Sequence, residues 1–279
     1  GRLRRPSAPQ EPLSVWWLGQ AGFFISGAGV NLLIDPYLSE HLAKKYRGRE
    51  FDHVRLMPAP MHPADATAVD YVLCTHRHGD HMDPEGLPAI MKASTECRLI
   101  APIAEQQAVR SMIPASLRTI LVNAGDVVAV GEQAWVQVIA SAHEDLRMNS
   151  HGEHHYLGYV LGLGGLRIYH SGDCVPYPGL VECLCHHRID VALLPINGRD
   201  PYRASHGVPG NFTFEEAVDL TIGADIPLMI CHHFGMFRFN TIAQNLIRQH
   251  IEVMGLNSRV LVPRIGVGYQ LRPGTPCVI

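Results

Sequence analysis

Four side chains of the kinds that bind metal ions occur within six residues of this chain, directly after a short apolar run. Residues 71–74 (YVLC) have the composition of a buried strand, and residues 76–81 (HRHGDH) follow them. Alternate residues of extended backbone share a face, so His76, His78 and Asp80 would point to one side. The glycine in the segment permits a tight bend, which lets His81 turn toward a second position. Imidazoles and a carboxylate at this spacing predict a site for zinc, manganese or iron.

One cluster cannot close a metal site, so further ligands are expected after other apolar runs. His143, Asp173, His232 and His233 each follow such a run. Taken alone, each of them is more often a structural residue than a ligand. Their shared position after apolar runs, together with the HRHGDH segment, favours a metal site to which several strand ends contribute.

The composition is that of a folded globular chain. Hydrophobic residues make up 47% and charged residues 18% of the 279 residues, which excludes intrinsic disorder. No apolar run reaches the roughly 18–20 residues of a membrane span. The formal net charge is −3, so no general basic field would attract nucleic acid or an anionic membrane. The cysteines show no CxxC spacing and no hydrophobic signal segment stands at the start, so we expect reduced thiols and a cytoplasmic location.

Short apolar runs separated by glycine and proline predict two strand-rich parts, each flanked by helices. We expect residues 1–12 to be a flexible leader with a tag remnant and residues 13–279 to form a single domain. Two sheets packed face to face with helices outside account for this order. Residues 199–212, which are rich in glycine and proline, are expected to form a mobile lid. The predicted helices cover residues 84–93 (with Asp83 as the N-cap), 103–112, 213–222 and 241–254. The predicted strands cover residues 13–18, 23–26, 30–34, 71–74, 98–101, 119–122, 127–130, 136–141, 156–163, 166–169, 191–194, 228–231 and 260–262.

The candidate ligands occur in the order of a known family. Asp35, the HRHGDH segment, His143, Asp173 and His233 resemble the five motifs of the metallo-β-lactamase fold superfamily, from about residue 13 onward. This resemblance implies an α/β (α+β) fold, a four-layer αββα sandwich with a metal site at one edge of the two sheets. The segments WLGQAGFFI, LLIDPYL, LLPINGRD and CHHFGMF resemble the L-ascorbate-6-phosphate lactonase branch.

The resemblance also implies two divalent metal ions, with zinc or manganese expected and iron as a further option. It implies that Asp173 bridges the ions and that Asp35 orients ligands by hydrogen bonding. Because HFGMF resembles the His-aromatic pattern of the family, His233 is preferred to His232, which would be a core residue or a support behind the ligands. A histidine at position 78, where redox relatives carry glutamate, favours hydrolysis over diiron chemistry. One ion would be held by His76, His78 and His143, and the other by Asp80, His81 and His233.

The predicted function is a metal-dependent hydrolase in which a metal-bound hydroxide opens a lactone or similar ester of a small, anionic, sugar-derived substrate. Asp80 would orient the attacking water beside His233. The predicted partner is this small molecule, with no nucleic acid and no membrane, and a homo-oligomer is compatible with the family. Arg199 would pair with an anionic group of the substrate or, alternatively, with Asp200 at the surface. The candidate substrate-binding residues are Asn197, Arg199, His206, Asn211 and Arg238.

Two other functions fit the same residues. The first is a metal-dependent phosphodiesterase acting on a nucleotide, RNA or phospholipid, which the near-neutral net charge disfavours. The second is a non-catalytic metal-binding protein on the same fold, which the complete ligand set disfavours.

Overall fold

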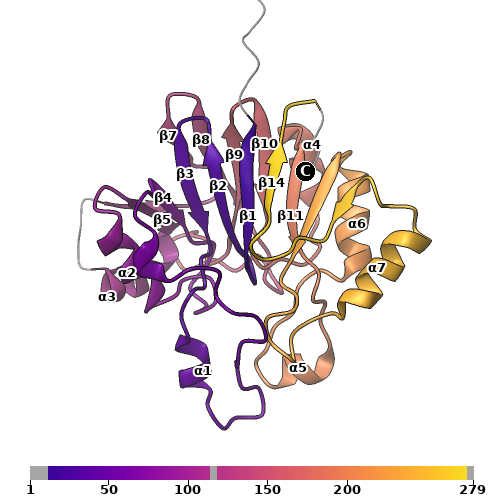
Figure 1. Cartoon of the computed structure of the whole chain (residues 1–279), viewed down its shortest axis with the longest axis horizontal. Coiled ribbons are helices and arrows are strands. Elements are labelled where there is room, and N and C mark those ends of the chain that lie inside the picture. Colours follow the sequence, from indigo (N-terminus) through magenta and orange to yellow (C-terminus); the bar gives the residue numbers. More distant parts are fainter. Residues whose placement is uncertain (1–11, 114–117, 275–279) are drawn as a thin grey trace, which may run out of the picture.

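The computed structural model describes residues 12–113 and 118–274 and contains two seven-stranded sheets. The predicted leader lies, apart from residue 12, outside the described residues. In both sheets one half is antiparallel and the other half is parallel. Figure 1 shows the two sheets side by side with helices along their outer flanks.

The first sheet has the order β14-β1-β2-β3-β4-β5-β6, in which β3 to β6 run parallel. The turn between β1 and β2 and the segments that follow β3 and β4 all lie near one end of this sheet. Its strands are β1 (Leu13–Gly19), β2 (Gly22–Gly27), β3 (Val30–Ile34), β4 (Tyr71–Leu73), β5 (Arg98–Pro102), β6 (Thr119–Val122) and β14 (Gly268–Leu271).

The second sheet has the order β13-β12-β11-β10-β9-β8-β7, in which β10 to β13 run parallel. Parallel neighbours end at the same edge, so residues that follow β10 and β12 come close together in space. Its strands are β7 (Val127–Gly131), β8 (Ala134–Ala140), β9 (Leu157–Leu163), β10 (Leu166–His170), β11 (Val191–Pro195), β12 (Leu228–His232) and β13 (Val260–Leu261).

The main core lies between the sheets. Alternating residues of β1 such as Val15 and Trp17 share one buried cluster with Val136 and Val138 of β8 and with Ile168 of β10. The opposite face of the first sheet packs against α2 (Gly86–Ala93) and α3 (Gln106–Met112). The second sheet is covered by α4 (Leu180–His187), α6 (Phe214–Gly223) and α7 (Gln244–Val253). The predicted αββα sandwich is confirmed.

The helix predicted over 84–93 begins later than expected. Its helical residues start at Gly86, but Asp83 does act at its beginning: Asp83 Oδ1 accepts a 3.1 Å hydrogen bond from the N–H of Glu85, and the Asp83 carbonyl accepts one from Leu87. The other carboxylate oxygen of Asp83 accepts from the backbone N–H groups of Leu38 and Ser39. Thr213 and Glu216 do form the predicted capping box of α6. The sequence analysis did not predict β14, α1 (His41–Lys45) or the short helix α5 (Pro201–Ser205), which lies in the segment expected to be a lid.

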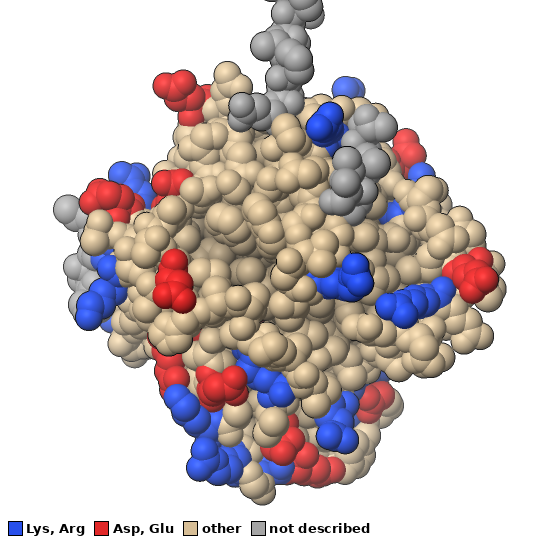
Figure 2. All heavy atoms as spheres, in the orientation of Figure 1, with Lys and Arg blue, Asp and Glu red and all other residues tan. Residues whose placement is uncertain are grey.

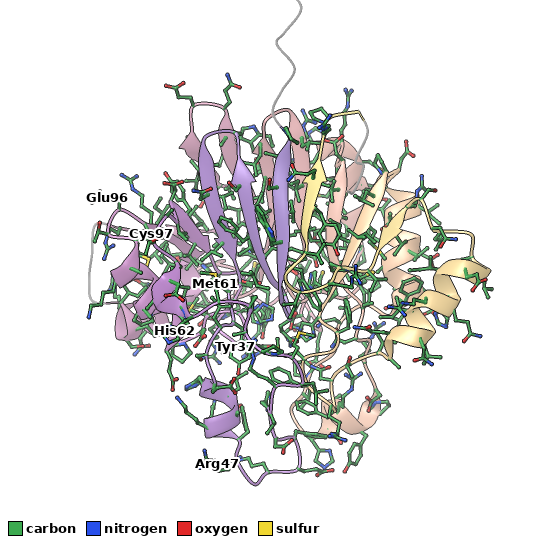
Figure 3. All side chains as sticks on the ribbon, viewed as in Figure 1. Tyr37, Arg47, Met61, His62, Glu96 and Cys97 are labelled. Carbon is green, nitrogen blue, oxygen red and sulfur yellow. The ribbon has the colours of Figure 1, made fainter. Side chains whose placement is uncertain are left out.

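The helices α1 and α5 and their loops form a lobe below the sheets (Figure 1). Figure 3 shows Tyr37 where this lobe meets the sheets and Arg47 at its far tip. Tyr37 is fully buried, and with Leu42, Met236 and Phe237 it forms a small apolar cluster that holds α1 to the rest of the molecule.

Acidic and basic side chains are intermingled over the face drawn in Figure 2, and many of them lie on the lobe. Among the described residues, no helix combines the length and apolar character that a membrane crossing requires.

Candidate metal centre

The seven predicted ligands converge at one edge of the two sheets. The HRHGDH segment follows β4, His143 follows β8, Asp173 follows β10 and His233 follows β12. Their candidate ligand atoms form two groups, and within each group the atoms lie within 4.8 Å of one another. The first group contains His76, His78, His143 and Asp173; the second contains Asp80, His81 and His233. The resemblance implied the same two sets of histidines with Asp80 in the second, and placed Asp173 as a bridge between them.

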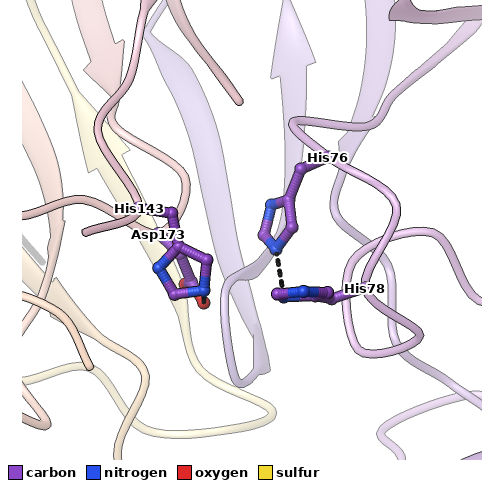
Figure 4. A group of neighbouring side chains, drawn as sticks. All are labelled: His76, His78, His143 and Asp173. Atoms are coloured by element: carbon purple, nitrogen blue, oxygen red, sulfur yellow. Dashed lines mark hydrogen bonds and ion pairs between the residues drawn. The ribbon is translucent and has the colours of Figure 1, made fainter. Parts of the chain in front are cut away.

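Three imidazoles and a carboxylate face one another in the first group. His76 Nε2 lies 3.0 Å from His78 Nδ1, and the ring of His143 lies 5.4 Å from that of His76 and 5.2 Å from that of His78. Figure 4 shows His143 and Asp173 facing His76 and His78 across the site. The ring of Tyr156 packs edge-on against these histidines and limits their movement.

Asp173 faces both groups. Its Oδ1 lies 3.2 Å from His81 Nε2 and 3.3 Å from His233 Nε2, while its Oδ2 lies 3.7 Å from His143 Nε2. Asp80 Oδ2 lies 3.8 Å from both His81 Nε2 and His233 Nε2. The Asp173 carboxylate is thus placed between the two groups, where one oxygen can serve each of them.

The electrostatics of the site favour ligation. Burial lowers the pKa of His76 well below its usual range, lowers that of His78, and lowers that of His143 to about 4, so these imidazoles are neutral and hold free lone pairs. Burial also opposes charge on His81, but the carboxylates of Asp173 and Asp35 outweigh it and raise the pKa of His81 well above its usual range. The site therefore favours positive charge beside its carboxylates.

A buried hydrogen-bond network orients the second group. Asp35 Oδ2 accepts a 2.7 Å hydrogen bond from His81 Nδ1, and Asp35 also accepts hydrogen bonds from the N–H and hydroxyl of Thr75. These bonds leave Nε2 of His81 directed toward the second group. Asp35 has a φ of 44° and His233 a φ of 60°, the left-handed region that non-glycine residues rarely adopt. Such strain persists only where the surroundings enforce it.

The residues present fit divalent cations. Among the described residues, His81 Nε2, His143 Nδ1 and Asp173 Oδ1 are buried polar atoms without a hydrogen-bond partner. An unpaired buried polar atom is costly, and a cation held between the two carboxylates and the imidazoles would satisfy His81 Nε2 and Asp173 Oδ1. The set of five histidines and two aspartates suits zinc, manganese or iron.

The two adjacent histidines after β12 have different environments. His233 belongs to the second group, whereas the ring of His232 stacks on that of His170 at 5.0 Å and packs edge-on against Phe23. Both ring nitrogens of His232 are buried and make no hydrogen bond within the described part of the chain. The predicted support role of His232 behind the ligands is therefore not what the structure shows; it is a core residue.

Most of the predicted substrate-binding residues lie away from the open part of the site. Asn197 donates to Asn240 Oδ1 and accepts from Asn211 Nδ2, so both predicted asparagines belong to a buried amide network. Arg199 pairs with Glu216 rather than with Asp200. Arg238 is exposed outside the cavity lining. Of the five candidate substrate-binding residues, His206 lines the cavity.

A cavity of about 590 Å³ opens above the ligands. Its floor includes residues of both groups, and its mouth is formed by the lobe, with Lys45, Tyr46 and Arg49 on one side. The sequence analysis missed these mouth residues because no motif marks them. It also missed Gln20, whose side-chain amide contacts the second group. The signal that could have found Gln20 is its place in the turn Gly19-Gln20-Ala21-Gly22, a buried polar residue between two apolar strands.

Comparison with known proteins places the chain in a family. The beta-lactamase superfamily domain model matches residues 30–234. A UPF0173 metal-dependent hydrolase from Archaeoglobus fulgidus is 27% identical over 262 residues, covering 92% of this chain and 99% of the relative. Another from Pyrococcus furiosus is 32% identical over 187 residues, covering 67% of this chain and 73% of the relative.

Solved structures share the fold. An isothiocyanate hydrolase from Delia radicum gut bacteria has a TM-score of 0.73 at 19% identity, covering 91% of this chain and 97% of that chain. A possible metal-dependent hydrolase from Veillonella parvula has a TM-score of 0.72 at 16% identity, covering 95% of this chain and all of the other. The matching domain model and the curated relatives, together with the two ligand groups and the αββα sandwich, show the family. The chain belongs to the beta-lactamase superfamily and, within it, to the UPF0173 metal-dependent hydrolases.

Proposed function

We propose that this protein is a two-metal hydrolase that opens a lactone or related ester of a small anionic molecule. The observation that carries the proposal is the Asp173 carboxylate, which lies between two ligand groups at the floor of a cavity of about 590 Å³. A carboxylate with one oxygen toward each group is the arrangement expected of a two-metal site. Cavities of roughly 300–1,000 Å³ accommodate small molecules, which favours a compact substrate over a polymer.

In this proposal the site residues have different roles in hydrolysis. His76, His78 and His143 would hold one cation, Asp80, His81 and His233 the other, and Asp173 would contact both. Two such ions polarise a carbonyl, acidify a bound water and stabilise the charge that develops on the carbonyl oxygen. Asp80 lines the cavity with its side chain 16% exposed, so its carboxylate can accept a hydrogen bond from the attacking water and orient it. The buried hydrogen bond from His81 to Asp35 keeps the imidazole in one orientation throughout.

The mouth of the cavity supports an anionic substrate. Lys45 and Arg49 flank the ring of Tyr46, with Lys45 Nζ at 5.0 Å and the Arg49 guanidinium carbon at 5.8 Å from its centroid. Neither cation has an ion-pair partner within the described ranges 12–113 and 118–274. Arg77 lines the same cavity. Cationic side chains along the cavity lining suit a carboxylate or phosphate attached to a small ring. The likeness of four segments to L-ascorbate-6-phosphate lactonases supports the same substrate class.

A hydrolysis panel tests this proposal. The metal-loaded protein is assayed with an anionic lactone, a neutral lactone and a generic phosphodiester, before and after chelation. We expect turnover that is fastest on the anionic lactone, lost on chelation and restored by added metal. Faster turnover of the phosphodiester would replace the proposal with a phosphodiesterase, and metal binding without turnover of any ester would replace it with a metal-binding protein.

A double variant distinguishes loss of the metal site from loss of the folded structure. Replacing His76 and His78 together with alanine should abolish turnover and leave a folded protein. The matched control replaces His186 and His187, two adjacent histidines at the end of α4 that lie outside both ligand groups. Full activity in the first variant would refute the assignment.

A further inference from the structure

Gln20 lies in the tight turn between β1 and β2 and is fully buried. Its side-chain Nε2 donates a 2.8 Å hydrogen bond to Asp80 Oδ2 and lies 3.0 Å from His233 Nε2. Its Oε1 is buried without a hydrogen-bond partner among the described residues. A neutral amide therefore lies between two of the three side chains of the second group.

The turn that carries Gln20 is anchored to two of the segments that supply ligands. The carbonyl oxygen of Gln20 accepts a 2.9 Å hydrogen bond from the backbone N–H of His233, and a second one from Trp17 Nε1. The carbonyl of the next residue, Ala21, is hydrogen bonded to His170, three residues before Asp173. The position of the Gln20 amide is thus set by the same strand ends that position the ligands.

Backbone strain at this turn is consistent with a functional constraint. Gln20 has a φ of 50°, in the left-handed region where glycine or asparagine is far more common. A non-glycine residue held there costs about 1 kcal/mol or more. The backbone hydrogen bonds to the Gln20 carbonyl hold this conformation, which places the buried side chain where it donates to Asp80.

We propose that Gln20 is a positioning residue of the metal centre, which holds Asp80 through the amide hydrogen bond so that Asp80 and His233 bind their cation together. Asp80 Oδ2 has two lone pairs, one for the amide and one for a metal ion. Hydrogen bonds behind a metal ligand typically change metal affinity by about 10- to 100-fold. The inference rests on the two-metal centre proposed above and does not depend on which substrate is hydrolysed.

Two variants at this position separate hydrogen bonding from direct ligation. Gln20→Asn tolerates the left-handed backbone but retracts the amide from Asp80. Gln20→Glu keeps the length, removes the donor and places a second carboxylate beside Asp80. The matched control is Gln270→Asn on β14, because Gln270 donates to Ser14 of β1 and so tests the same region of the sheet without touching the site.

The readout is Co²⁺ binding to the metal-free protein, followed by visible absorption and by competition with a chelator. We expect two Co²⁺ per chain in the parent protein, and in both Gln20 variants a loss of affinity of about 10- to 100-fold for one of them, with the positions of the absorption bands retained. The Gln270 control should bind as the parent does, and thermal unfolding of each metal-free variant checks that the fold is intact.

Two results would overturn the inference. Unchanged affinity in both Gln20 variants would show that the amide does not position Asp80. Shifted absorption bands in Gln20→Asn would show that the amide of residue 20 ligates the metal directly. If the parent protein bound only one Co²⁺, the two-metal proposal itself would fail, and this outcome is distinguishable because it appears before any variant is made.

Discussion

The floor and the mouth of the cavity are built in different ways. The floor is lined by ligands such as Asp80 and Asp173, which follow regular strands. Most of the seven ligands are buried, and side chains such as Asp35 and Gln20 hold them by hydrogen bonds. The mouth consists of exposed side chains such as Lys45 and Arg49 on the short helix α1 and the loop that follows it. The side chains of the floor are suited to binding metal ions. Residues of the mouth can be substituted without disturbing the hydrophobic core.

This contrast has an energetic basis. Removing one partner from a buried, hydrogen-bonded charged pair leaves the other unpaired and costs several kcal/mol. An exposed cation is solvated whether or not it finds a partner, so its removal costs little folding free energy. Substitutions at the floor should therefore affect metal binding, stability and turnover together, whereas substitutions at the mouth should affect substrate affinity alone.

Asp173→Ala should have the largest effect. Its carboxylate contacts His81, His143 and His233, so both ligand groups lose a member. We expect kcat/KM to fall by about 10³-fold or more, equivalent to about 4 kcal/mol of transition-state stabilisation, with loss of metal measured per chain. The control is Asp219→Ala, an exposed aspartate of α6. Retention of two metals and of full activity would show that Asp173 does not join the groups.

Asp35→Asn should affect stability and metal affinity without touching the cavity. The variant removes the buried charge that pairs with His81 at 2.7 Å. We expect about 3 kcal/mol lower unfolding free energy for the metal-free protein in urea, and about 10- to 100-fold weaker metal binding. An unchanged urea midpoint would contradict the view that the floor depends on this hydrogen bond.

Lys45→Ala combined with Arg49→Ala tests the mouth. Both side chains are exposed and neither pairs with an acidic residue among those described, so the folding free energy should hardly change. We expect KM for an anionic lactone to rise about tenfold, or about 1.4 kcal/mol, with kcat unchanged. KM for a neutral lactone should stay as it is, and an equal rise for both substrates would argue against recognition of charge.

Arg199→Ala should have the smallest effect. Arg199 makes a partly exposed ion pair with Glu216 at the start of α6 and lies outside the cavity lining. We expect less than about 1 kcal/mol of lost stability and no change in KM. A clear rise in KM for the anionic lactone would restore Arg199 as a substrate-binding residue.

Much of the fold and nearly all of the floor could be predicted from the sequence. The HRHGDH segment, His143, Asp173 and His233 each follow an apolar run, and strand ends of parallel sheets meet at one edge. Of the two adjacent histidines, His233, which the resemblance favoured, is the one that lies in the second group. The predicted capping residue Asp83 does accept a hydrogen bond from the N–H of Glu85, whereas its second role, binding the backbone of Leu38 and Ser39, could not be predicted from local sequence.

The substrate-binding candidates were harder to predict because local sequence does not say where a loop lies. Asn197 follows a strand as the ligands do, but its amide is held inside the protein by hydrogen bonds with Asn211 and Asn240. Arg199 is charged and begins the predicted lid, but it pairs with Glu216 of α6 and does not line the cavity. Lys45 ends a helix of five residues that no periodicity indicates, and Arg49 lies in the loop that follows it.

The amino-acid sequence by itself determined most of the strands and the order in which candidate ligands follow them. It therefore determined the chemistry of the floor, because hydrophobic periodicity and metal-binding side chains are local properties. Only the tertiary structure decided that Gln20 donates a hydrogen bond to Asp80 and that α1 lies beside the cavity. These features arise from contacts between segments far apart in the chain, such as Gln20 and His233, and such contacts form only when the two sheets pack together.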